Sequence, residues 1–251
     1  MSKQSIASHF RSVIARGKHC YWVLLDPDDF STREGASIAR EAQRAGVDGL
    51  LIGGSLIHSS MFDAFVKAVK QAVRIPVILF PGDASQLSRH ADAVLYLSLI
   101  SGRNPVNLIG EHVKAAPLIR EYGIEPIPTA YMLVEAGTVT SVEFMSNTRP
   151  LPRNKPRIAA AHALAAQYMG MAMVYLEAGS GAPETVPDEM IKVVRSQISI
   201  PLIVGGGIRD ARTAIRKLAA GADIIVTGNM LQSRDGLRTM REIAKAVDGY
   251  K

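Results

Sequence analysis

The sequence predicts an α/β fold consisting of a single (β/α)8 TIM-type barrel, and three observations support this. The chain has 251 residues, a length typical of one such barrel. Its short apolar runs lack alternating polarity, which is typical of parallel strands buried on both faces. Stretches with helical spacing of apolar residues separate most of these runs, so strands and helices alternate along the chain.

Eight strands and seven helices follow from these patterns. Proline near several helix starts and glycine after several ends mark the helix boundaries. The predicted strands are Cys20–Leu25, Gly49–Gly53, Pro76–Phe80, Ala93–Leu97, Glu125–Leu133, Ala172–Leu176, Pro201–Val204 and Asp223–Val226. The predicted helices are Arg33–Ala45, Met61–Val73, Pro105–Tyr122, Pro156–Met169, Pro187–Gln197, Arg209–Ala220 and Leu237–Val247.

Two connections depart from the regular barrel. Only Pro81 to Asp92 separate the third and fourth strands, so the third helix is expected to be missing or replaced by extended chain. After the fifth strand, Glu135 to Lys155 form a long excursion on the active face, where such segments are often lids. Residues Thr138 to Phe144 in this excursion look strand-like. No linker or second domain is visible, so residues 1–251 are predicted to form one domain.

Composition excludes several classes of protein. A hydrophobic content of 47% and a charged content of 21% argue against disorder and fibrous repeats. The net charge is +6, but the basic residues are scattered among acids, so no nucleic-acid stripe is evident. This charge suits an anionic small molecule and a membrane surface equally well.

Neither a disulfide framework nor a membrane span is expected. Cys20 is the one cysteine, which excludes a cysteine metal site and indicates a cytoplasmic location. The Cys20 side chain is expected to pack inside a strand. The N-terminal stretch lacks the apolar core of a signal peptide. The low-charge stretch from Ile158 to Leu176 is better explained by a helix ending at Gly170 and a strand than by a membrane span.

Three glycine-containing loops follow the last three predicted strands. The first is the segment from Tyr175 to Gly181, and the others contain Gly205-Gly206-Gly207 and Gly228-Asn229. Backbone N–H groups in such loops, with helix N-termini behind them, bind phosphate, and barrels place this site after strands seven and eight. The alternative is that these glycines only turn the chain. Phosphate binding is favoured over it because two adjacent loops occur in the order that barrels use for this site.

Acidic residues follow the first strand, in the segment Asp26-Pro27-Asp28-Asp29. Asp26 is nearest the strand end and is the best metal candidate, because Mg²⁺ takes one or two carboxylates and completes its shell with water and phosphate oxygens. Asp29 is assigned instead to capping the following turn. Ser55, after Gly53 and Gly54, offers a hydroxyl to the same cluster.

Glu177 directly follows an apolar run, where an unpaired buried carboxylate is costly. Its glycine and serine neighbours favour a functional role over a structural pair. The basic residues Arg149, Arg153, Lys155 and Arg157 are candidates to close over an anion. A charged loop that is only solvated explains them equally well.

The motifs LLDPDD, GLLIGGS, VILFPG, PTAYML, VYLEAGSG, VGGGIR and TGN occur in this order. Together they resemble the geranylgeranylglyceryl phosphate synthases and their PcrB-type relatives, over nearly the whole chain. The short third connection also fits this family, whose barrel lacks that helix. The Asp-rich motif of chain-elongating prenyl synthases is absent.

The resemblance implies a Mg²⁺-dependent prenyltransferase of lipid biosynthesis. It would join the 3-hydroxyl of sn-glycerol 1-phosphate to a prenyl diphosphate, with geranylgeranyl favoured, and release diphosphate. Asp26 and Ser55 would hold Mg²⁺, and Glu177 would face the reacting hydroxyl and the allylic carbon. A homo-oligomer and a peripheral membrane contact are also implied. The residues implied to bind glycerol phosphate are Tyr175, Leu176, Glu177, Ala178, Gly179, Ser180, Gly181, Gly206, Gly207, Gly228 and Asn229.

The implied reaction is physically consistent with these residues. A metal on Asp26 would neutralise the departing diphosphate, and Glu177 would accept the hydroxyl proton and favour the developing cation. The apolar tail needs a groove, for which the middle strands offer Leu95, Leu97, Leu99 and Tyr131, and the missing helix would leave room. The alternatives are an isomerase or lyase acting on a sugar phosphate, and a non-catalytic phosphate-binding barrel.

Overall fold

The computed structural model describes residues 5–58 and 60–250. Eight parallel strands form one closed barrel in which each strand pairs with its neighbours in chain order and β8 pairs with β1. Closure leaves the barrel without an unpaired edge. The strands are β1 Cys20–Leu25, β2 Gly49–Ile52, β3 Val77–Leu79, β4 Ala93–Leu99, β5 Glu125–Leu133, β6 Met173–Glu177, β7 Leu202–Gly205 and β8 Ile224–Thr227.

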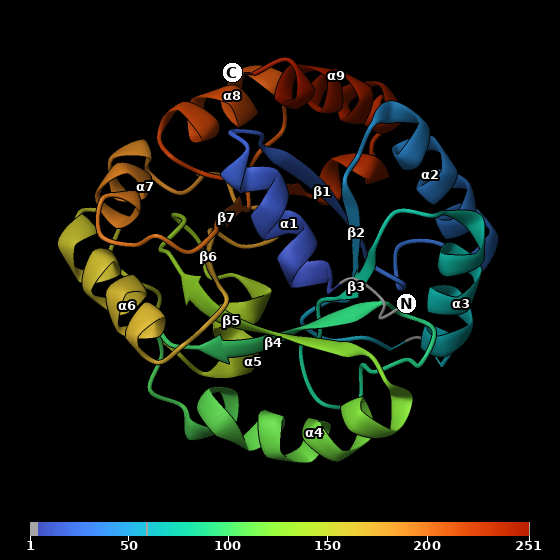
Figure 1. Cartoon of the computed structure of the whole chain (residues 1–251), viewed down its shortest axis with the longest axis horizontal. Helices are drawn as coiled ribbons and strands as arrows, with labels where there is room; N and C mark the ends of the chain where they lie inside the picture. The colour runs from blue at the N-terminus through green and yellow to red at the C-terminus, as the bar shows by residue number, and fades with distance from the viewer. Residues whose placement is uncertain (1–4, 59, 251) are drawn as a thin grey trace.

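Helices form a ring around this barrel (Figure 1). Most of them connect one strand to the next, as expected for a β/α repeat. The α-helices are α1 Ile6–Ala15, α2 Thr32–Ala45, α3 Phe62–Ala72, α4 Glu111–Tyr122, α5 Ser141–Ser146, α6 Pro156–Tyr168, α7 Asp188–Arg195, α8 Ala211–Ala219 and α9 Gly236–Asp248. Two further segments are the π-helix η1 Val106–Gly110, which leads into α4, and the 3-10 helix η2 Asn229–Gln232.

The first helix closes one end of the barrel. In Figure 1, α1 crosses the middle of the ring. Its Phe10 is fully buried and meets the ring of Trp22 edge-on, with centroids 4.7 Å apart. At its N-terminus, the Glu125 carboxylate accepts a hydrogen bond from the backbone N–H of Ile6 at 2.6 Å, where a negative charge complements the helix dipole. Because α1 covers the end where the strands begin, ligands have access from the end where the strands finish.

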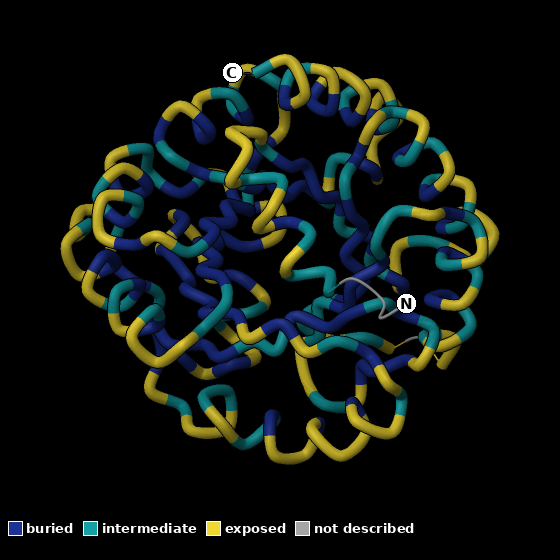
Figure 2. The backbone as a smooth tube through the Cα atoms, viewed as in Figure 1, coloured by how far each residue is buried: buried dark blue, intermediate teal, exposed yellow. Residues whose placement is uncertain are grey.

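Two apolar layers hold the fold together. One fills the barrel interior and includes Trp22, Leu95 and Tyr175, and the other lies between the sheet and the helices. Figure 2 shows the corresponding pattern, with buried chain along the strands and exposed chain on the outer helix faces. Cys20 lies buried in the inner layer, as predicted.

The predicted strands agree with the structure to within a residue or two at each end. The missing third helix is also confirmed, because residues 80–92 contain no helix. Among the described residues, no helix is both long and apolar enough to cross a membrane. The stretch from Ile158 to Leu176 divides into most of α6 and most of β6, as predicted.

The strand-like prediction for Thr138 to Phe144 is wrong, because part of this segment forms α5. The side chain of Thr140 caps the helix by accepting a hydrogen bond from the backbone N–H of Glu143 at 3.3 Å. Asn147 ends the helix in the left-handed conformation, with φ of 49°. These two caps outweigh the strand preference of the β-branched residues. The sequence also did not reveal α1.

Candidate active site

Glu177 is the last residue of β6. Strand alternation places it on the same inner face as Met173 and Tyr175. The backbone N–H of Gly179 donates to its Oε1 at 2.6 Å, and the Tyr175 hydroxyl donates to the same carboxylate. Burial raises the pKa of Glu177 to about 7, and the two hydrogen bonds oppose this rise. The carboxyl group can therefore exchange a proton near neutral pH.

Two glycines at the end of β7 leave room for this carboxyl group. A Cβ atom on Gly206 would lie 2.4 Å from Oε1 of Glu177, and one on Gly205 would lie 2.5 Å from the Tyr175 hydroxyl oxygen. Gly206 also has a φ of +83°, which residues with a side chain rarely adopt. Glycine is therefore required at Gly206 by its contact and by its backbone conformation.

The glycine loops predicted from the sequence come together. The Ser180 hydroxyl donates to Oδ1 of Asn229, which joins the loop after β6 to the loop after β8. Arg209, from the loop after β7, donates through Nη2 to the carbonyl oxygens of Gly181 at 3.1 Å and Ala182 at 2.9 Å. The three loops thus form one continuous rim at the mouth of the barrel.

The residues of this rim contribute differently. The side chains of Leu176 and Ala178 pack in the outer apolar layer, so only their backbone can face a ligand. Gly179 and Gly181 have positive φ values of 101° and 69°, which turn the chain sharply around Ser180. Turned backbone of this kind directs N–H groups towards an anion.

Asp26 follows β1 and lies beside the loop after β2. Its Oδ1 accepts the backbone N–H of Asp28 at 3.0 Å, while a Cβ on Gly54 would lie 2.6 Å from its Oδ2. Burial raises the pKa of Asp26, against the hydrogen bond from Asp28. Ser55 follows Gly54 directly and lines the pocket described below. One carboxylate and one hydroxyl form an oxygen-only donor set, which fits Mg²⁺ that also binds water and phosphate oxygens.

Asp29 does not cap the turn after β1, contrary to the prediction. Its carboxylate accepts a hydrogen bond from Nε2 of Gln232 at 2.5 Å, which ties this turn to η2. The turn is closed by Asp26, whose backbone oxygen accepts the N–H of Asp29 at 3.1 Å. The turn preference of Asp suggested a local role for Asp29, whereas its partner Gln232 lies about 200 residues away in the sequence.

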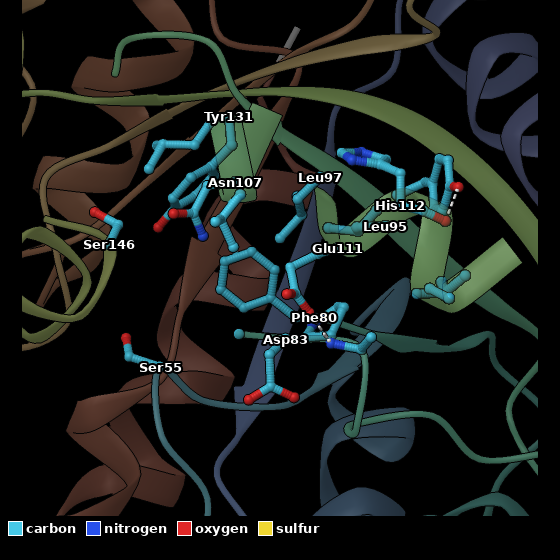
Figure 3. A pocket seen from close by; sticks show the side chains of 18 of the residues that line it. Ser55, Phe80, Asp83, Leu95, Leu97, Asn107, Glu111, His112, Tyr131 and Ser146 are labelled. Carbon is cyan, nitrogen blue, oxygen red and sulfur yellow. Dashed lines mark hydrogen bonds between the residues drawn. The ribbon is translucent and has the colours of Figure 1, made fainter. Parts of the chain in front are cut away.

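A cavity of about 300 Å³ opens beside these groups (Figure 3). The predicted groove residues Leu95, Leu97, Leu99 and Tyr131 all line it. It extends between β4 and α4 into the space beside residues 80–92, where the third helix is missing. The structure therefore provides the predicted room. Its outer wall includes Ala84, Leu87, His112, Ala115 and Ile119.

Three aromatic rings connect this cavity to Glu177. Phe80 and Tyr131 line the cavity, and their ring centroids are 5.7 Å apart. Tyr175 stacks on Phe80 at 5.5 Å and meets Tyr131 edge-on at 5.4 Å. The sequence reasoning did not assign Phe80 a role, although it belongs to the quoted motif VILFPG. The three rings pack together between the apolar cavity and the carboxyl group.

The excursion after β5 lies against both the glycine rim and the cavity. A Cβ on Gly179 would lie 2.3 Å from Cγ2 of Thr140, so α5 starts in direct contact with the first glycine loop. Val142 and Met145 of α5 line the cavity and were missed, although their spacing of three is a helical signal. Arg153 is tied to the carbonyl oxygens of Glu135 at 2.9 Å and Thr185 at 3.1 Å. The contacts of Arg153 are therefore structural.

Comparison with known proteins agrees with this geometry. The chain is 48% identical over 223 residues to geranylgeranylglyceryl phosphate synthase of Thermococcus gammatolerans, covering 88% of each chain. It is 46% identical to the Pyrococcus horikoshii protein of the same name, covering 92% of this chain and 90% of the relative. The crystal structure of (S)-3-O-geranylgeranylglyceryl phosphate synthase from Thermoplasma acidophilum in complex with sn-glycerol-1-phosphate superposes with a TM-score of 0.93 at 34% identity, covering 98% and 99% of the two chains.

The family model described as PcrB matches residues 13–247, which span every strand of the barrel. Together with the identities above, this match shows that the chain belongs to the PcrB family.

Proposed function

We propose that this chain is a prenyltransferase that joins the 3-hydroxyl of sn-glycerol 1-phosphate to a prenyl diphosphate, with geranylgeranyl diphosphate favoured. The observation that carries the proposal is the position of Glu177. This buried carboxyl group lies between a rim of glycine loops and an apolar cavity. An isomerase or lyase acting on a sugar phosphate would use the rim, but it would have no use for the apolar cavity.

The glycine rim binds the phosphate of sn-glycerol 1-phosphate in this proposal. The segments Tyr175–Gly181, Gly206–Gly207 and Gly228–Asn229 would surround the phosphate with backbone N–H groups. In the first segment these would come from Ser180 and Gly181, because the N–H groups of Ala178 and Gly179 donate to Gly205 and Glu177. The Thermoplasma acidophilum relative was crystallised with this substrate, which supports the assignment. Anchoring the phosphate orients the distant hydroxyl towards Glu177 and thereby lowers the entropic part of the barrier.

Asp26 and Ser55, which follow β1 and β2, would hold Mg²⁺ beside the β8 end of the glycine rim. When bound, the metal supplies charge neutralisation for the departing diphosphate. The chain contributes by keeping the Asp26 carboxylate against the Gly54 backbone, where no side chain intervenes.

Glu177 accepts the proton of the 3-hydroxyl as the ether bond forms. The allylic carbon–oxygen bond to diphosphate breaks, the glycerol oxygen bonds to that carbon, and the hydroxyl proton moves to the carboxylate. A pKa of about 7 suits this transfer near neutral pH. The ionised carboxylate also favours positive charge on the allylic carbon, and the Tyr175 hydroxyl holds it in place.

The cavity beside Tyr131 and Phe80 accommodates the prenyl tail. Its lining is mainly aliphatic and aromatic, and it begins at the aromatic rings that contact the Glu177 region. Burial of the tail in such a pocket is favourable because it removes apolar surface from water.

We further propose that residues 1–251 act as one catalytic domain in a cytoplasmic homo-oligomer with peripheral membrane contact. Exposed apolar side chains support association, including Val113 of α4 at 67% and Tyr168 of α6 at 78% exposure. A lipid product supports contact with a membrane surface.

The proposal is tested by incubating purified protein with Mg²⁺, one glycerol phosphate enantiomer and a prenyl diphosphate, followed by lipid extraction and mass spectrometry. We expect a prenylglyceryl phosphate from sn-glycerol 1-phosphate, formed best from geranylgeranyl diphosphate. Absence of product with this enantiomer would reject the proposal, and equal use of both enantiomers would contradict the binding mode.

A further inference from the structure

The segment that replaces the third helix, residues 80–92, is here named the β3–β4 crossover. Side-chain hydrogen bonds attach it to its surroundings at several points, and three of them involve residues 84–88. Gln86 binds Gly54, Glu111 of α4 accepts the backbone N–H of Ala84 at 2.7 Å, and the Ser88 hydroxyl donates to Asp63 of α3 at 2.7 Å. Figure 3 shows the Glu111 contact at the edge of the cavity. The crossover is therefore fixed in place although it lacks helical hydrogen bonds.

Of these three hydrogen bonds, the one made by Gln86 reaches the loop after β2. Its side chain is buried, at 4% exposure. Its Nε2 donates to the carbonyl oxygen of Gly54 at 3.0 Å, and its Oε1 accepts the backbone N–H of Gly82 at 3.0 Å. Both ends of the amide group are used, so Gln86 links the crossover to the loop that contains Ser55.

Backbone contacts reinforce this link. A Cβ on Gly82 would lie 2.6 Å from the carbonyl oxygen of Gly54 and 2.8 Å from that of Ser55. On the other side of the same loop, a Cβ on Gly54 would lie 2.6 Å from Oδ2 of Asp26. The loop is thus packed between the crossover and the Asp26 carboxylate, without side chains in between. A shift of the crossover is transmitted directly to both proposed metal ligands.

We infer that Gln86 is a positioning residue that holds Gly54 and Ser55 in place and so maintains the diphosphate-binding end of the site. The crossover also supplies Pro81, Ala84 and Leu87 to the cavity wall. One segment therefore fixes the proposed diphosphate and tail positions relative to each other. This inference rests on the proposed function, because it assumes that Asp26 and Ser55 bind Mg²⁺ and diphosphate. It adds a role for a residue outside the metal and phosphate motifs.

Ser88 provides a matched control. It is fully buried and belongs to the same crossover. Its hydroxyl donates to Asp63 and accepts the backbone N–H of His90 at 3.2 Å, so neither bond reaches Gly54. Ser88→Ala loses crossover support without touching the loop after β2. Gln86→Met preserves side-chain length and removes both of its hydrogen bonds. Gln86→Glu retains the acceptor for Gly82 and removes the donor to Gly54.

The test measures binding by calorimetry with geranylgeranyl thiolodiphosphate, a slowly reacting analogue, in the presence and absence of Mg²⁺. We expect Mg²⁺-dependent binding to the unmodified protein, and a dissociation constant about tenfold higher in Gln86→Met and Gln86→Glu, the low end for residues that support metal ligands. Ser88→Ala should bind as the unmodified protein does. Affinity for sn-glycerol 1-phosphate should stay unchanged in all three variants, which also shows that they fold.

The outcomes separate this inference from the proposed function. Mg²⁺-dependent binding that is equal in Gln86→Glu and Ser88→Ala would overturn the role of Gln86 and leave the proposed function standing. Lack of Mg²⁺-dependent binding to the unmodified protein would overturn both. If Gln86→Met loses its affinity for glycerol phosphate, its fold is disturbed. The analogue affinity of Gln86→Glu then decides whether Gln86 has the inferred role.

Discussion

The two halves of the barrel mouth are built in different ways. The half formed by β6, β7 and β8 is polar and made of short loops that bind one another through Ser180, Asn229 and Arg209. The half formed by β3, β4 and β5 is an apolar cavity whose walls come from the β3–β4 crossover, η1, α4 and α5. Glu177 lies where the halves meet, which suits a reaction between a polar and an apolar substrate.

This comparison explains why one half is easier to predict from sequence. The glycine rim is made of local motifs, each placed at a strand end, so Gly206 and Asn229 can be located without knowing the fold. The cavity has no such motif. The missing helix and the groove residues of β4 and β5 were predicted from the sequence. Phe80, Ala115 and Met145 lie far apart in the sequence and line one cavity only in the folded barrel.

The largest expected effect concerns the groups at the junction of the two halves. Glu177→Gln removes the proton acceptor, and Asp26→Asn removes the carboxylate proposed to bind Mg²⁺. Each should lower turnover by at least ~10²-fold, as measured by product formation under saturating substrates. Near-normal rates in both variants would contradict the assigned roles.

A second change tests the polar half alone. Gly206→Ala places a Cβ against Oε1 of Glu177 at a positive φ, so it should lower kcat/KM for sn-glycerol 1-phosphate by roughly tenfold to a hundredfold. Gly170→Ala is the matched control, because Gly170 has a similar φ of +79° and nothing within 4 Å of a Cβ. An equal loss in the control would mean that backbone strain, not the contact with Glu177, is responsible.

A third change tests the apolar half. Ala115→Phe should fill part of the cavity and shift the preference from geranylgeranyl towards shorter prenyl diphosphates, by about tenfold in the ratio of kcat/KM values. The control is Ala116→Phe, the same substitution at the adjacent, exposed position of this helix. An unchanged ratio in Ala115→Phe would place the tail outside this cavity.

The last expected effect is on stability rather than on turnover. The pKa of Glu177 lies near 7 in the folded chain, above its ordinary value of 4.5, so folding favours the protonated form. Stability is therefore lost as the pH rises from about 4.5 through 7, by on the order of 3 kcal/mol. Glu177→Gln should lack this loss, and denaturant unfolding at pH 5 and pH 8 would measure it. Parallel pH dependence in both proteins would show that the Glu177 pKa is not raised.

The pH dependence of kcat/KM for sn-glycerol 1-phosphate tests the central claim most directly. If Glu177 accepts the hydroxyl proton, activity should rise with pH through an apparent pKa near 7 in the unmodified protein. The residual activity of Glu177→Gln should lack this transition. The same transition in both proteins would contradict the claim that Glu177 takes the proton where the two halves of the site meet.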